Sequence, residues 1–137
     1  MAENGTTAVV GFNGTEHARR AALRAAELAG REGRLIVVVV IEPSQAIGAR
    51  IEDIEPHERT HSRELVSQAQ ALLRSTGVTV EIEERIGDPA EEIVRASEER
   101  AADVIAVGRG EHRLEPLRRR VWDRVVRDAS LPVIVVP

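Results

Sequence analysis

Two histidines and a glutamate follow the pattern H-E-x-x-H at His57, Glu58 and His61. In zinc hydrolases with this pattern, the histidines lie one helical turn apart and hold the metal while the glutamate activates water. The flanking residues are polar, whereas a catalytic helix should be largely buried, and no third histidine follows at the extended motif's spacing. We therefore expect an adventitious pair of surface histidines and no metal site, with zinc hydrolysis as the alternative. The candidate third ligands lie on a predicted strand: Glu81, Glu83 and Glu84.

A second group of candidate residues follows two apolar runs. Asn13-Gly14-Thr15 comes after AVVGF, and Gly108-Arg109-Gly110 comes after VIAV. Ligands of open parallel sheets bind beyond the carboxyl ends of the strands, so these two loops and the one at Glu42 are candidates for a ligand site. His17 is expected to be exposed, and the alternative is that it contacts a ligand at the Asn13 loop. A similar ligand contact is the alternative for His112, in the loop after Gly110.

The composition excludes several chemistries. The 137 residues include no cysteine, tyrosine or lysine, and all 19 basic residues are arginine. The chain therefore lacks a Walker-type lysine, a pyridoxal Schiff base, thiolate catalysis and cysteine-bound metal. It also has no G-x-S-x-G elbow, so we expect no catalytic residue.

The composition also argues against nucleic acid and membranes as partners. With Phe12 and Trp122 as the only aromatic residues and a net charge of −4, the chain offers no stacking platform and no basic balance for nucleic acid. No apolar run approaches the ~20 residues of a membrane span, and the first residues carry no signal pattern. We expect a cytoplasmic protein with no nucleic-acid or membrane partner.

Apolar runs and amphipathic stretches alternate strictly, which predicts one α/β domain over residues 1–137. Thr15 and Asp88 are the expected N-caps of the first and third helices, with Pro89 and Glu91 completing the second start signal. Such alternation implies a mostly parallel sheet with helices on both faces and a ligand site beyond the strands' carboxyl ends. The predicted strands are 8–12, 35–41, 78–85, 104–107 and 133–136, and the predicted helices are 16–29, 56–74, 89–100 and 117–128.

Four stretches together resemble the universal stress protein family: VVGFNGTEHARRAALRAAELA, GDPAEEIVRASEERAADVIAVGRG, the arginine-rich helix and DASLPVIVVP. Their order covers nearly the whole chain, from Ala8 to Val136. The resemblance implies a Rossmann-like fold with strand order 3-2-1-4-5, commonly a homodimer, that binds ATP in some members and not in others.

The family's nucleotide site uses an aspartate after the first strand and a glycine loop after the fourth. Asn13 stands at the aspartate position here, and the second glycine of the loop is displaced by one residue. Where the family has glycine followed by serine or threonine, this chain has Arg119 and Arg120. The candidate cofactor-binding residues carried over from the resemblance are Asn13, Val40, Gly108, Arg109, Gly110, Arg119 and Arg120.

Positive charge is concentrated between Arg109 and Arg127, where seven arginines face three acidic residues. One interpretation is an anion site that replaces the glycine loop. The other is a solvated face whose arginines pair with nearby carboxylates, which is the common outcome for such runs. The acidic candidates for those pairs are Glu111, Glu115, Asp123 and Asp128.

The last predicted strand is apolar and should lie at a sheet edge, which invites pairing. We expect a homodimer through Val133, Ile134, Val135 and Val136. Two hypotheses for function follow. The first is a non-catalytic stress-response module that needs no cofactor and acts through its dimer surface or a protein partner. The second is a member that still binds ATP or AMP through Asn13, the backbone near Val40 and the Gly108–Gly110 loop, with at most slow hydrolysis.

Overall fold

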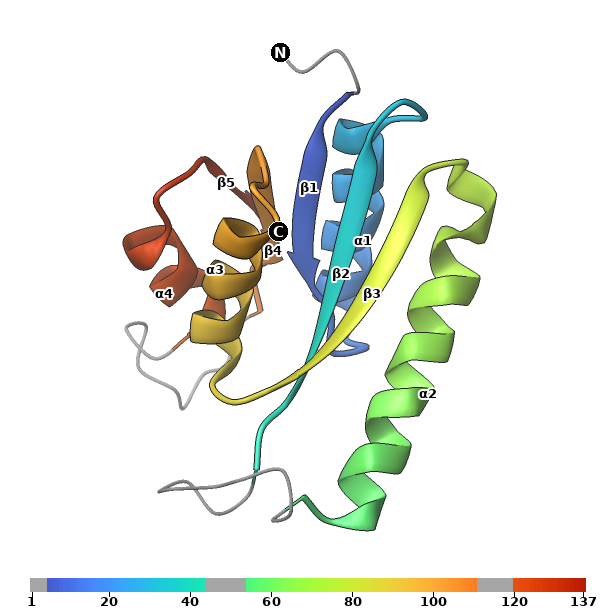
Figure 1. Cartoon of the computed structure of the whole chain (residues 1–137), viewed down its shortest axis with the longest axis vertical. Helices are drawn as coiled ribbons and strands as arrows, with labels where there is room; N and C mark the ends of the chain where they lie inside the picture. The colour runs from blue at the N-terminus through green and yellow to red at the C-terminus, as the bar shows by residue number, and fades with distance from the viewer. Residues whose placement is uncertain (1–4, 44–53, 111–119) are drawn as a thin grey trace.

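The protein folds as a parallel sheet of five strands in the order β3-β2-β1-β4-β5 (Figure 1). The computed structural model describes residues 5–43, 54–110 and 120–137. This order and the parallel pairing confirm the predicted fold class. The strands are β1 (Thr7–Gly11), β2 (Arg34–Ile41), β3 (Thr79–Ile86), β4 (Val104–Gly108) and β5 (Val133–Val136).

Helices cover both faces of the sheet. One face carries the first two helices and the other carries the last two (Figure 1). The elements are α1 (Glu16–Ala29), α2 (Pro56–Leu73), a short 3-10 turn η2 (Arg74–Thr76), α3 (Pro89–Glu99) and α4 (Val121–Asp128). The strand order runs first to one side of β1 and then to the other, so right-handed crossovers place two helices on each face.

The two apolar layers follow from strand alternation. In β2, Leu35 and Val37 face the α1–α2 layer, whereas Ile36 and Val38 face the α3–α4 layer. All four are fully buried, as the unbroken β-branched run predicted. Small side chains let α1 lie close to the sheet, because its buried face consists of six alanines: Ala18, Ala21, Ala22, Ala25, Ala26 and Ala29.

Most predicted helix ends are confirmed. The Thr15 side chain accepts from the Ala18 N–H, and the Asp88 side chain accepts from the Glu91 N–H. The last helix differs. Arg120 has an extended backbone and precedes the first helical residue, Val121, so the helix starts later than the predicted Leu117. Residues 117–119 of that prediction lie outside the described residues. Two valines of this helix, Val121 and Val126, are exposed.

The edge strand β3 is covered by ion pairs on its α3 side. Arg100 pairs with Glu81 and Glu83. Arg85 pairs with Glu83 at 3.1 Å, and it reaches two carboxylates of α3, namely Glu92 at 2.9 Å and Glu99 at 3.0 Å. Glu81, Glu83 and Arg85 are alternate residues of β3, so they lie on one face of this edge strand.

Candidate functional site

A cleft of about 380 Å³ opens at the carboxyl ends of β1, β2 and β4. This is where open parallel sheets bind ligands, because the strand order reverses direction between β1 and β4. Its walls come from both helical layers. The lining residues are Gly11, Phe12, Asn13, His17, Ala18, Val38, Val40, Glu42, Pro89, Ile93, Val107, Gly108, Val121 and Trp122. The cleft therefore brings together three of the predicted site residues, Asn13, Val40 and Gly108.

Asn13 belongs to a small polar cluster at the start of α1. Its Oδ1 atom lies 2.6 Å from Thr15 Oγ1 and 3.2 Å from the Thr15 backbone nitrogen. Thr15 Oγ1 also lies 3.0 Å from His17 Nε2. His17 is half-buried rather than exposed, so that prediction was wrong. Its burial, and secondly the positive charge of Arg20, lower the pKa of the imidazole below 6.5.

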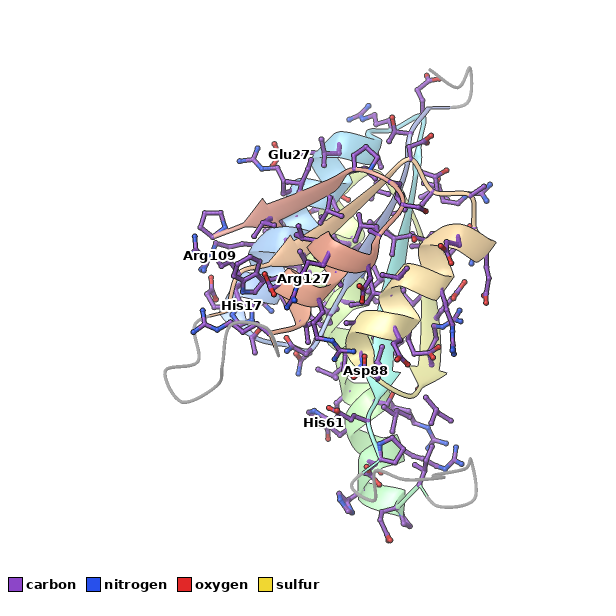
Figure 2. All side chains as sticks on the ribbon, turned by 90° about the vertical axis from the view of Figure 1, so that its left-hand side faces the viewer. His17, Glu27, His61, Asp88, Arg109 and Arg127 are labelled. Carbon is purple, nitrogen blue, oxygen red and sulfur yellow. The ribbon has the colours of Figure 1, made fainter. Side chains whose placement is uncertain are left out.

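The His17 ring explains the spacing of the two glycines after β4. A Cβ atom on Gly108 would lie 2.5 Å from the His17 carbonyl oxygen, and one on Gly110 would lie 2.6 Å from His17 Nε2. A side chain at position 108 would therefore require the backbone to move, whereas one at position 110 would require the end of the His17 ring to move. Gly108 therefore packs against the backbone of α1 at His17, and Gly110 packs against the imidazole ring of His17. His17 and Arg109 lie on the same side of the molecule (Figure 2).

The backbone of Val40 also faces the cleft. In a parallel strand, both polar groups of one residue point to the same neighbouring strand, and those of the next residue point to the other. The Val38 carbonyl accepts from the Phe12 N–H at 2.9 Å, so Val40 presents its groups on the same side. The last β1–β2 pair is Gly11 with Val38, so the β1 chain has already left the sheet at this level.

Trp122 is a cleft residue that was not among the predicted site residues. The indole forms part of the cleft wall, and the Arg109 guanidinium lies over it at 5.3 Å from the ring centroid. Such a contact stabilises a cation over an aromatic face. The buried Trp122 Nε1 has no hydrogen-bond partner within the described part of the chain. The only sequence signal was that Trp122 is the chain's one tryptophan, set within the arginine-rich segment.

Of the other described arginines in the arginine-rich segment, two form ion pairs and one lies at the start of α4. Arg124 pairs with Asp88 at 2.8 Å, and Arg127 pairs with Asp123. These contacts support the solvated, paired interpretation for this half of the segment. Arg120 is the residue that precedes α4. Arg119 and His112 lie outside the described residues.

The H-E-x-x-H motif occupies the first two turns of α2, where His57 and His61 are exposed. His61 lies apart from His17 (Figure 2). Among residues 5–43, 54–110 and 120–137, no three His, Cys, Asp or Glu side chains gather as a metal site. The glutamates considered as third ligands have other contacts: Glu84 accepts from the Ser62 hydroxyl at 2.6 Å, and Glu81 and Glu83 pair with Arg100.

The comparisons with known proteins agree with this architecture. Residues 6–137 match the model of the universal stress protein family. The chain belongs to this family. Among curated universal stress proteins, Rv1636 of Mycobacterium tuberculosis (strain ATCC 25618 / H37Rv) is 33% identical over 110 residues, which cover 74% of each protein.

Solved universal stress proteins share the fold. A crystal structure of one in complex with cAMP has a TM-score of 0.75 and 23% identity, covering 98% of this chain and 99% of that chain. The structure of the Archaeoglobus fulgidus protein in complex with dAMP has a TM-score of 0.71 and 23% identity, with the same coverage. In this universal stress protein, none of the described helices has the length and apolar character that crossing a membrane requires.

Proposed function

We propose that this universal stress protein is a binding protein that holds an adenine nucleoside monophosphate in the cleft above β1, β2 and β4. The observation that supports this most directly is the cleft itself. Its volume of about 380 Å³ lies within the roughly 300–1,000 Å³ typical of small-molecule sites, and it joins apolar walls to a few polar groups. This favours the second of the two sequence-based hypotheses over a module that works without a nucleotide.

The walls suit a nucleoside. Phe12, Ile93 and Trp122 offer apolar surface for a planar base. The Val40 backbone supplies one donor and one acceptor at the exposed end of β2, which is the pattern that a base edge requires. Asn13 supplies a polar side chain on the opposite side, at the end of β1.

A monophosphate fits the loop after β4 better than a triphosphate does. The family's extended glycine loop leaves backbone N–H groups accessible to a chain of phosphates. Here Gly108 and Gly110 are fitted to His17, and Arg109 packs on Trp122. One phosphate can be met by the Arg109 guanidinium at the cleft margin. The cAMP and dAMP of the two structural relatives are also monophosphates.

The cleft supports binding rather than catalysis. Only Asn13, His17 and Glu42 contribute polar side chains to its described lining. His17 is bonded to Thr15, and Glu42 is exposed at the end of β2. No activated nucleophile with an adjacent base lies among these residues, as covalent catalysis would need.

We also propose that the protein is a homodimer through the open edge of β5. The Pro132 and Val136 carbonyls accept from the Ile105 and Arg109 N–H groups. Strand alternation therefore turns the backbone groups of Val133 and Val135 away from β4, towards the outer edge. Both side chains are only partly buried, so pairing with a second copy would cover apolar surface as well as these groups.

The test is titration with AMP, cAMP and ATP, followed by calorimetry and by the fluorescence of Trp122, the only tryptophan. We expect AMP or cAMP to bind with a Kd on the order of micromolar, with a fluorescence change, and ATP to bind no more tightly. Trp122→Ala should weaken binding, whereas Leu23→Ala, on the exposed side of α1, should not. The absence of heat and of a fluorescence change with all three nucleotides would contradict the proposal and favour the nucleotide-independent hypothesis.

A further inference from the structure

The H-E-x-x-H motif at the start of α2 is a feature that the nucleotide cleft does not use. His57 and His61 lie four residues apart within one continuous α-helix, Pro56–Leu73, and both are exposed. Residues at this spacing lie on the same face of a helix, with Cβ atoms about 5–6 Å apart. The two imidazole rings are therefore placed to meet one ion from the same side of α2.

The first turn of α2 is held in helical form, which matters because His57 is only the second helical residue. Pro56 occupies the first helical position, where its fixed φ angle favours the helix. The Glu55 carbonyl accepts from the Glu58 N–H at 3.0 Å and from the Arg59 N–H at 3.2 Å. The Glu58 carboxylate in turn accepts from the Glu55 N–H at 2.9 Å. These contacts oppose fraying of the helix end, so the two histidines keep their relative placement.

Glu58 has a different task here from the glutamate of zinc hydrolases. In those enzymes the glutamate of the motif activates a metal-bound water. In this protein the Glu58 carboxylate closes the capping box at the start of α2. It is therefore engaged in stabilising the helix end rather than free to act as that base. The structure thus separates the two parts of the motif, and only the histidine pair remains available for a ligand.

The charges around the histidine pair favour a cation. Glu64 Oε2 lies 3.8 Å from His61 Nδ1. His57, His61 and Glu64 have the spacing i, i+4 and i+7, which forms one stripe along a helix. Arg63 lies two residues after His61 and so belongs to the other side of α2. A carboxylate beside Nδ1 favours the proton on that nitrogen and leaves the lone pair on Nε2, as is common for histidines that bind metals.

We propose that His57 and His61 form a surface site for one divalent transition-metal ion of the class that imidazole prefers, Ni²⁺, Cu²⁺ or Zn²⁺, with water completing the coordination. Once one ring binds the ion, the other is present at a high effective concentration, so the pair acts as a chelate. The polar flanks that argue against a hydrolytic zinc site are compatible with such a solvent-exposed binding site. The site is separate from the nucleotide cleft, whose described lining includes neither histidine.

The first test follows the four histidines by NMR while untagged protein is titrated with Ni²⁺ at pH 7.5. A bound paramagnetic ion broadens the signals of the residues that hold it. We expect the ring signals of His57 and His61 to broaden at substoichiometric Ni²⁺, while the signal of His17 stays sharp. Single histidine-to-glutamine variants assign the signals. Broadening of His17 or His112 ahead of the pair would overturn the proposal.

The second test measures affinity by calorimetry. We expect one Ni²⁺ or Zn²⁺ ion per chain with a Kd on the order of micromolar, and no binding of Mg²⁺, which prefers oxygen ligands. His57→Ala and His61→Ala should each weaken binding about tenfold or more, because the chelate is lost. The matched control combines His57→Ala with Arg63→His at an exposed position, which keeps four histidines but places two of them on opposite sides of α2. It should bind as weakly as His57→Ala, and wild-type affinity in this control would overturn the proposal.

Glu64 gives a further readout. Glu64→Gln keeps the shape of the side chain and removes its charge, so it should weaken Ni²⁺ binding about threefold, below the roughly 10–100-fold typical of groups that support metal ligands, because water screens an exposed charge. A loss as large as that of His61→Ala would make Glu64 a ligand and contradict the two-histidine site. Half an ion per chain would mean that the ion bridges two copies, which would contradict it as well. Circular dichroism of each variant verifies that α2 is intact, and AMP binding by His57→Ala should equal that of the wild type.

Discussion

The Asp88 carboxylate receives both ends of the Arg124 guanidinium, with Nη1 2.8 Å from Oδ1 and Nη2 2.8 Å from Oδ2. Asp88 is also the N-cap of α3, since its side chain accepts from the Glu91 N–H. The Asp88 carboxylate thus caps the N-terminus of α3 and also connects α3 to α4 through the ion pair. Burial alone would raise the pKa of Asp88, but the hydrogen bonds from Arg124 and Glu91 together outweigh it and lower the pKa below 3.8.

Asp88→Ala should lower the free energy of unfolding by about 1–2 kcal/mol, measured by chemical denaturation, because the cap and the ion pair are lost together. Glu98→Ala, exposed on the same helix, is the control and should change little. Because the carboxyl pKa is lower in the folded state, the contribution of Asp88 is present above pH 3.8 and is lost as the pH falls through the folded pKa. Equal effects of the two variants would contradict this assignment.

His17 should titrate below 6.5 in an NMR pH titration, since burial and the Arg20 charge both disfavour the imidazolium. Arg20→Met should raise the His17 pKa only part of the way towards 6.5, because burial is the larger cause. The unfolded chain binds more protons than the folded chain between the two pKa values. The free energy of unfolding should therefore decrease as the pH falls from 6.5 through the folded pKa, and this decrease should be absent in His17→Gln. A His17 pKa above 6.5 would be inconsistent with the burial seen here.

Alanine at the two glycines after β4 should behave differently when His17 is shortened. Gly108→Ala should destabilise the protein by about 1–3 kcal/mol in any background, because the new methyl group meets backbone atoms of His17. Gly110→Ala meets the end of the ring instead, so its cost should largely disappear in a His17→Ala background. Denaturation of the wild type, the three single variants and the two double variants gives the coupling energies. Equal coupling at both positions would show that the ring is not the obstacle.

Sedimentation analysis at micromolar concentration should give a dimer. Val135→Pro removes an N–H that faces the outer edge, so it should produce monomers with a folded core. Ile134→Pro, whose N–H faces β4, should instead destabilise the sheet itself, as monitored by circular dichroism and thermal unfolding. A wild-type monomer at that concentration would contradict the dimer proposal.

Local chemistry made much of the fold predictable from the sequence. The β-branched run of β2 marks a central strand, the alanines of α1 mark a helix lying against the sheet, and Asp88 followed by Pro89 marks a helix start. These signals lie within a few residues of the structure that they specify. Asn13 and Gly108 could be assigned to the cleft because parallel strands end at one edge of the sheet, whereas Val40 was carried over from the family resemblance.

What could not be predicted depends on contacts between distant segments. His17 is half-buried because Gly110, far away in the sequence, packs on its ring. Trp122 reaches the cleft from the first turn of α4, whose N-cap, Arg120, makes no side-chain cap hydrogen bond that a sequence pattern would reveal. Periodicity identifies an apolar face, but it does not tell whether that face meets the core or the wall of a cleft.

The ion pairs on β3 have a consequence for how many copies can assemble. A sheet with two adhesive edges can add copies at both ends and grow into a filament, whereas a sheet with one adhesive edge stops at a closed pair. Glu81, Glu83 and Arg85 place a row of fixed charges on the β3 strand, and an incoming strand would have to lie beside them. If β5 pairs as proposed, the opposite margin of the sheet resists further addition, and assembly ends at two copies.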